Sequence, residues 1–259
     1  MAAPALRPLS LGEVLDVSFG LYRSLFLPLL MVTLVTRALP LVVSVYIEAA
    51  GGALTNLPLY VATLLANAIL GAIAAAASTF IVAENYLGRR ISAGEAFNRA
   101  MPYTGRLIVV AMLSSFIIVI GFLLLIVPGF ILFAGLVLAT PAMVLEGIPA
   151  ATDALGRSWS LTRGYRFKLF VGLIVILILL YLPFLALGGF AAVSLPKTPE
   201  AAAATVSSPT FLVVMALSAL LQTLIFPLFY CMLTVAYYDL RVRKEAFDLE
   251  VLASSLASA

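Results

Sequence analysis

The chain has 259 residues, of which 64% are apolar and 10% charged, and its mean hydropathy is +1.17. Soluble globular proteins have roughly 45–50% apolar and 25% charged residues, so this composition excludes a water-soluble domain. The net charge of +3 reflects basic residues placed in loops and does not indicate nucleic-acid binding. The sequence contains no histidine, which excludes Ser-His and Cys-His catalytic pairs and histidine-based zinc sites.

Six apolar segments lie between polar breaks, and each is near or above the roughly 17–25 residues that a helix needs to cross hydrocarbon. They predict an all-α polytopic membrane protein with six transmembrane helices. The fourth segment is the shortest and follows the third across Pro128-Gly129, so segments 107–127 and 130–146 either span fully or form a re-entrant hairpin. The six segments are Leu25 to Glu48, Pro58 to Glu84, Leu107 to Val127, Phe130 to Glu146, Leu169 to Val193 and Phe211 to Tyr238.

A short amphipathic motif recurs before each pair of apolar segments. Ser10 and Ser92 are each followed three residues later by a glutamate, Glu13 and Glu95, as in a capping box at a helix start. A looser copy begins at Ala150. We predict three repeats, each an interfacial amphipathic helix followed by a transmembrane hairpin. The single membrane domain, 1–259, then has units at about 8–84, 90–146 and 149–239 and a cytoplasmic tail at 240–259.

The basic residues predict the orientation. Thirteen of the fifteen Lys and Arg residues flank the segments on one face, whereas the loops of the opposite face carry one, Lys197. The positive-inside rule places that basic face, with both termini, in the cytoplasm. A basic face of this kind also attracts anionic lipid headgroups.

The second segment of each unit ends in an acid, Glu84, Glu146 or Asp239. Negative charge at a helix C-terminus opposes the helix macrodipole, so each acid is expected to have a positive partner. The interfacial arginines, including Arg157 and Arg163, are the nearest candidates. The cluster is interpreted either as a structural clamp or as a ring of charges around a cytoplasmic entrance.

Arg37 lies near the middle of the first apolar segment, where a cation costs roughly 2.5 kcal/mol or more on insertion scales. Candidate partners are Glu48, Asn67 and Gln222. One interpretation is an arginine that snorkels or bonds to carbonyls freed near Pro40. The other is an anion or lipid-phosphate site formed by Arg37, Asn67 and Gln222.

Several motifs together resemble a prokaryotic family named for the membrane domain of glycerophosphoryl diester phosphodiesterase. The resemblance covers nearly the whole chain and implies a protein of the prokaryotic plasma (inner) membrane. Stand-alone members of that family have no assigned function, and no catalytic residue can be carried over. The motifs are Arg7 to Glu13 with Asp16, Val127-Pro128-Gly129, Glu146-Gly147, Ala154 to Gly164 and Tyr238 to Glu245.

Two functions fit these observations. The first is a non-enzymatic scaffold, anchor or accessory subunit of a membrane complex, with the lipid bilayer and a protein at the cytoplasmic face as partners. The alternative is a small transporter or lipid translocase with a polar path near Arg37, which requires Arg37, Asn67 and Gln222 to converge on one cavity. We expect no cofactor, no metal site and no catalytic residue.

Overall fold

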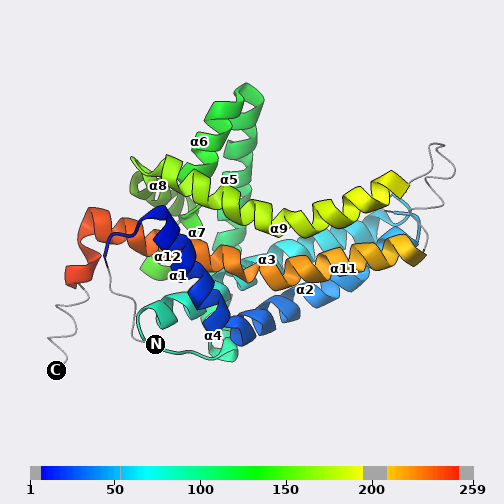
Figure 1. Ribbon diagram of the computed structural model, residues 1–259, viewed down its shortest axis with the longest axis horizontal. Helices are drawn as coiled ribbons and strands as arrows, with labels where there is room; N and C mark the ends of the chain where they lie inside the picture. The colour runs from blue at the N-terminus through cyan, green and yellow to red at the C-terminus, as the bar shows by residue number, and fades with distance from the viewer. Residues whose placement is uncertain (1–6, 53, 195–208, 251–259) are drawn as a thin grey trace.

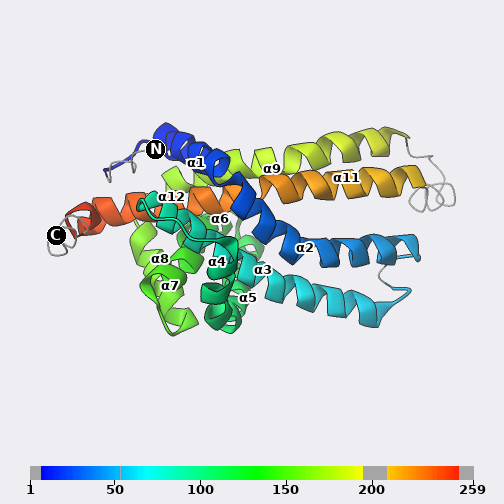
Figure 2. The ribbon, with the colours of Figure 1, turned by 90° about the horizontal axis from the view of Figure 1, so that it is seen from below.

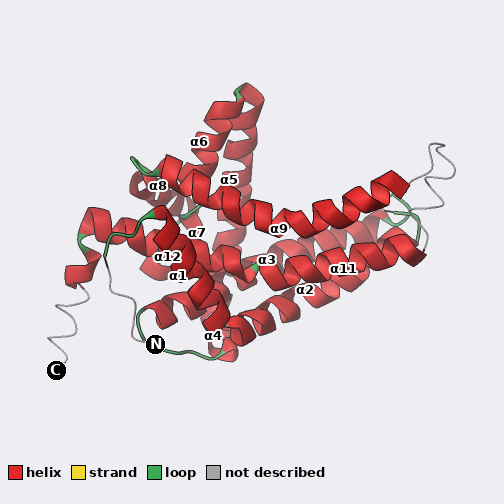
Figure 3. Ribbon diagram, in the orientation of Figure 1, coloured by secondary structure: helices red, strands yellow, loops and turns green. Residues whose placement is uncertain are grey.

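The computed structural model describes residues 7–52, 54–194 and 209–250, and every regular element in these ranges is a helix (Figure 3). The predicted all-α class is therefore confirmed for this part of the chain, whereas Lys197 lies outside it. The helices are α1 (Leu11–Ser24), α2 (Phe26–Ala49), α3 (Leu57–Tyr86), α4 (Ala93–Ala100), η1 (Met101–Tyr103), α5 (Thr104–Leu124), α6 (Ile126–Leu136), α7 (Ala139–Glu146), α8 (Ala151–Thr162), α9 (Arg166–Ser194), α11 (Pro209–Ile225) and α12 (Pro227–Glu245).

Within the residues that the structure describes, five helical segments are long and apolar enough to cross a membrane, which is compatible with a membrane location. A sixth is obtained only if α8 and the described start of α9, which meet at a bend of 104°, are counted as one broken span. The five are Phe26–Ile47, Leu57–Tyr86, Ala93–Leu124, Ile126–Glu146 and Ala216–Glu245.

Four long helices, α2, α3, α9 and α11, run alongside one another along the long axis of the molecule (Figures 1 and 2). α2 packs against α3 and α11, and α11 packs against α9. Their outer faces carry exposed large apolar side chains, among them Val35 at 66% and Leu65 at 61% exposed. We call this set the four-helix group.

The third and fourth apolar segments contribute an antiparallel hairpin of α5 and α6, which points away from the axis of the four-helix group (Figure 1). Its turn lies at Leu125 and not at the predicted Pro128-Gly129 break, since both of these residues belong to α6. Glycine allows the close approach of its two helices, because a Cβ added at Gly121 would lie 2.5 Å from Leu132 and 3.1 Å from the Gly129 backbone. The predicted fourth segment is not one helix, since α6 ends at Leu136 and α7 begins at Ala139.

The short helices α1, α4 and α8 gather with the ends of α3, α7 and α12 at one end of the four-helix group (Figure 2). We call this assembly the polar layer. Ser10 forms the predicted capping box with Glu13, and Ser92 accepts the predicted bond from the Glu95 amide at 3.1 Å. The looser third copy begins at Ala150 without a side-chain cap.

The sixth apolar segment differs from the prediction, because Pro227 divides it into α11 and α12. Proline has no backbone N–H and cannot continue the helical hydrogen-bond ladder. Beside the break, the Tyr22 hydroxyl of α1 donates to the Leu224 carbonyl at 2.8 Å. α12 is buried almost throughout and runs on to Glu245, so the first residues of the predicted tail are helical.

Candidate functional site

Asp239 of α12 is the most buried acid of the polar layer, with a side chain only 2% exposed. Its carboxylate accepts from the Leu9 amide at 2.7 Å, from Lys168 Nζ at 2.6 Å and from Arg243 Nε at 3.0 Å. Lys168 Nζ also donates to the Leu9 carbonyl at 2.5 Å. This cluster therefore ties the residues before α1 and the start of α9 to the end of α12.

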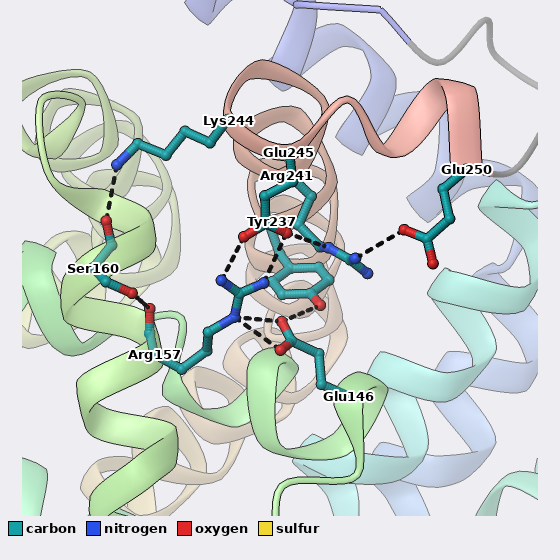
Figure 4. A network of polar contacts seen from close by, with 8 residues as sticks. All are labelled: Glu146, Arg157, Ser160, Tyr237, Arg241, Lys244, Glu245 and Glu250. Carbon is teal, nitrogen blue, oxygen red and sulfur yellow. Dashed lines mark hydrogen bonds and ion pairs between the residues drawn. The ribbon is translucent and has the colours of Figure 1, made fainter.

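Glu146, at the end of α7, is the centre of a second cluster (Figure 4). It accepts from Arg157 Nε at 2.8 Å and from the Tyr237 hydroxyl at 2.7 Å. Arg157 bridges to Glu245 at 2.8 Å, and Arg241 Nε donates to the same Glu245 at 2.9 Å. The hydrogen bond to Glu245 raises the pKa of the Arg157 guanidinium. The cluster joins α7, α8 and α12.

Glu84, near the end of α3, holds the third cluster. It accepts from Arg89 Nε at 2.5 Å and from Arg99 Nη1 at 3.0 Å, and Arg99 also pairs with Glu95 at 2.5 Å. These bonds fix α4 against the end of α3. Each arginine is more than 40% exposed, so these pairs stabilise the fold less than the buried Asp239 cluster.

The structure thus gives all three predicted acids a positive partner, but it distributes the partners differently from the sequence expectation. Arg157 pairs with Glu146, whereas Arg163 is exposed and forms no ion pair among the described residues. Sequence reasoning missed Arg243 and Lys168. Arg243 follows Asp239 by four residues, which is a readable helical ion-pair spacing. Lys168 is brought to Asp239 only by the tertiary fold.

Arg37 lines a cavity of about 310 Å³ where α2, α9, α11 and α12 meet at the Pro227 break. Its guanidinium carbon lies 4.0 Å from the centroid of the Phe226 ring, a cation–π contact worth about 2 kcal/mol when desolvated. Within the described ranges, Arg37 has no ion pair and no side-chain hydrogen bond, and the side chain of Glu48 lies outside them. The cavity is lined by Arg37, Leu177, Leu180, Tyr181, Gln222, Phe226 and Phe229.

Asn67 does not line this cavity. It is exposed on α3, and its amide donates to the Thr63 carbonyl one turn earlier at 3.0 Å. The structure therefore brings Arg37 and Gln222 together and leaves Asn67 apart. Within the described residues, no group of three or more His, Cys, Asp or Glu side chains is placed to hold a metal ion.

Residues 56–240 match the model of a family described as Domain of unknown function (DUF7847). The chain belongs to this family. The matched range runs from the N-cap of α3 into α12 and leaves α1 and α2, with Arg37, outside it. No curated protein and no solved structure matches the chain. The resemblance to the glycerophosphoryl diester phosphodiesterase membrane domain stays a prediction from motifs.

Proposed function

We propose that this protein is a non-enzymatic multi-pass membrane protein that acts as a scaffold, anchor or accessory subunit of a membrane complex. The observation that best supports this proposal is that ion pairs and hydrogen bonds hold the helices of the polar layer together. The three acid clusters hold α1, α4 and α8 against the ends of α3, α7, α9 and α12. The carboxylates at their centres are engaged in bonds within the fold, and the layer presents a fixed polar surface that a partner protein can recognise.

The proposed arrangement in the membrane follows the three-unit pattern, with each amphipathic helix in the cytoplasmic interface and each apolar pair forming a hairpin. Both termini are then cytoplasmic in a prokaryotic plasma membrane. The basic residues of the polar layer face anionic lipid headgroups, each contributing about 1 kcal/mol of attraction near the surface. The α5–α6 hairpin returns the chain to the side from which it entered, so this orientation is the same whether or not the hairpin crosses.

Site-specific photo-crosslinking in cells tests the scaffold proposal. A photoreactive amino acid at Asn98 of α4 or at Gly156 of α8, both exposed, is expected to give a protein adduct of defined mass. The same group at Val35, exposed on the apolar face of α2, serves as the matched control and should label lipid. Glu146→Gln, which weakens the bond holding α8, should reduce the adduct from Gly156 and spare that from Asn98. Lipid adducts alone from both α4 and α8 would contradict the proposal.

A small transporter or lipid translocase is the second candidate. The cavity beside Arg37 is the observation in its favour, but the convergence of three residues that it requires is met only by Arg37 and Gln222, because Asn67 lies outside the cavity. This function needs a continuous polar path, of which the cavity supplies two of the three predicted residues. Reconstituted protein should then move a fluorescent phospholipid between the leaflets of a liposome. Movement that is lost in Arg37→Gln would support the translocase over the scaffold, and movement no faster than in protein-free liposomes would exclude it.

A further inference from the structure

We propose that the cavity beside Arg37 binds the oxyanion head of a bilayer amphiphile, a carboxylate or a phosphate carried on an aliphatic chain. This inference goes beyond the scaffold function and does not depend on it. It rests on three observations. The guanidinium of Arg37 has no hydrogen-bond acceptor among the described residues, the walls around it are largely apolar, and the cavity borders an apolar outer surface.

Arg37 lies deep in the apolar part of α2. At 1.5 Å per residue it is roughly 16 Å along the helix from Phe26, about half of the ~30 Å hydrocarbon thickness of a bilayer. At this depth Arg37 forms an ion pair with none of the described carboxylates of the polar layer. Arginines at such a depth in a membrane face a polar partner, the bundle interior or a water-filled cavity.

The guanidinium has five N–H donors in a planar fork, and none of them has an acceptor among the described residues. The Phe226 ring covers one face of the group at 4.0 Å, but a contact on the face leaves the edge, where the N–H groups point, free to bind. That edge matches the paired oxygens of a carboxylate or phosphate, which arginine binds with two parallel hydrogen bonds. Gln222, the second polar side chain of the lining, can donate a further bond from its amide.

The remaining walls suit an aliphatic chain. Leu177, Leu180 and Phe229 are apolar, and a volume of about 310 Å³ is at the lower end of the range for small-molecule sites. Such a volume accepts a small head and the first part of a chain. The lining residue Tyr181 is 54% exposed, between Ile178 at 56% and Leu182 at 55% on the same helix. The cavity thus borders an apolar outer surface, so its occupant reaches it from the bilayer.

Native mass spectrometry of the full chain released from an uncharged detergent tests the proposal. The probes are palmitate, 1-hexadecanol with the same chain length and no charge, and inorganic phosphate. We expect one palmitate per chain, with binding weakened at least about tenfold in Arg37→Gln, as when a charge-assisted hydrogen-bonding partner is removed. Hexadecanol should bind weakly and equally to both proteins. Arg163→Gln, which removes an exposed cation outside the cavity, is the matched control and should bind palmitate as the wild type does.

A second variant keeps the test decisive if Arg37→Gln does not fold. Leu177→Trp retains the arginine and fills the cavity, and it should also lose palmitate. Inorganic phosphate that binds in an Arg37-dependent way and displaces palmitate would retain the oxyanion site but assign its ligand to the aqueous phase. Equal palmitate binding by the wild type, Arg37→Gln and Leu177→Trp would overturn the proposal, and so would hexadecanol binding as tightly as palmitate.

Discussion

The carboxylate of Asp239 shows how single residues stabilise the polar layer. Its two oxygens accept from one backbone amide and two cations, although the side chain is only 2% exposed. A buried carboxylate is tolerated when its lone pairs are satisfied in this way, and removing it leaves two cations without their partner. Asp239 is therefore more important to stability than the exposed pairs around Glu84.

Asp239→Asn is expected to reduce the free energy of unfolding by about 3–5 kcal/mol, the usual cost of removing one member of a buried ion pair. Titration of the purified protein with a denaturing detergent, followed by circular dichroism, measures the change. Asp16→Asn is the control, because Asp16 is exposed and forms no ion pair in the described part of the chain. A loss as small as that of the control would show that Lys168 and Arg243 are satisfied without the carboxylate.

Glu13 gives the start of α1 a dependence on pH. Hydrogen bonds from Arg7 and from Ser10 lower its pKa to about 2. The unfolded chain, with a glutamate pKa of about 4.3, binds more protons between these two values, so the wild type should lose stability as the pH falls from about 4.3 to 2. Glu13→Gln keeps a capping side chain without the charge. Hydrogen exchange of α1 amides should show this loss in the wild type only, and an identical pH profile in the variant would refute the assignment.

At the scale of elements, the sequence predicts the helices and both Ser caps, because periodicity and capping are local properties. It does not predict where the apolar segments divide. Pro227 interrupts the last segment, whereas Pro40 lies inside an unbroken α2, so the same residue type gives both outcomes. The packing around each proline decides whether the helix is interrupted there, as the hydrogen bond from Tyr22 to the Leu224 carbonyl illustrates. The Arg37 cavity lies at that break, and its lining includes Gln222 but not Asn67.

The contact between α6 and α8 requires a glycine at position 135. Ser158 and Thr162 donate to the Gly135 carbonyl at 2.8 and 3.2 Å, and an added Cβ would lie 2.5 Å from Trp159 Cε3. Gly135→Ala should therefore cost about 1–3 kcal/mol through overpacking and displace the indole, which Arg166 covers at 3.4 Å.

Trp159 is the only tryptophan of the chain, so its fluorescence reports this displacement directly. Gly105→Ala is the matched control, since nothing lies within 4 Å of its added Cβ in α5. A helical glycine replaced by alanine in open space should be neutral or gain up to about 1 kcal/mol. An unchanged Trp159 emission in Gly135→Ala would mean that α8 can move away without cost.

At the scale of the whole molecule, the tip of the α5–α6 hairpin is more apolar than the loop between α2 and α3. From Phe116 to Ala139 the sequence carries no polar side chain, and the tip residues Leu125, Ile126 and Val127 are 67%, 68% and 67% exposed. The loop between α2 and α3, by contrast, contains Thr55 and Asn56. A tip that exposes three consecutive large apolar side chains is stable in hydrocarbon and not in water.

Cysteine labelling in intact cells tests both the orientation and this tip. The native Cys231 is fully buried, and Cys231→Ala gives an unreactive background. In that background a membrane-impermeant maleimide should label Thr55→Cys from outside and Asn98→Cys only after permeabilisation. Val127→Cys should stay unlabelled under both conditions, because its thiol is then surrounded by lipid. Labelling of Val127→Cys from outside would make α5 and α6 full spans, and labelling of Asn98→Cys in intact cells would reverse the proposed orientation.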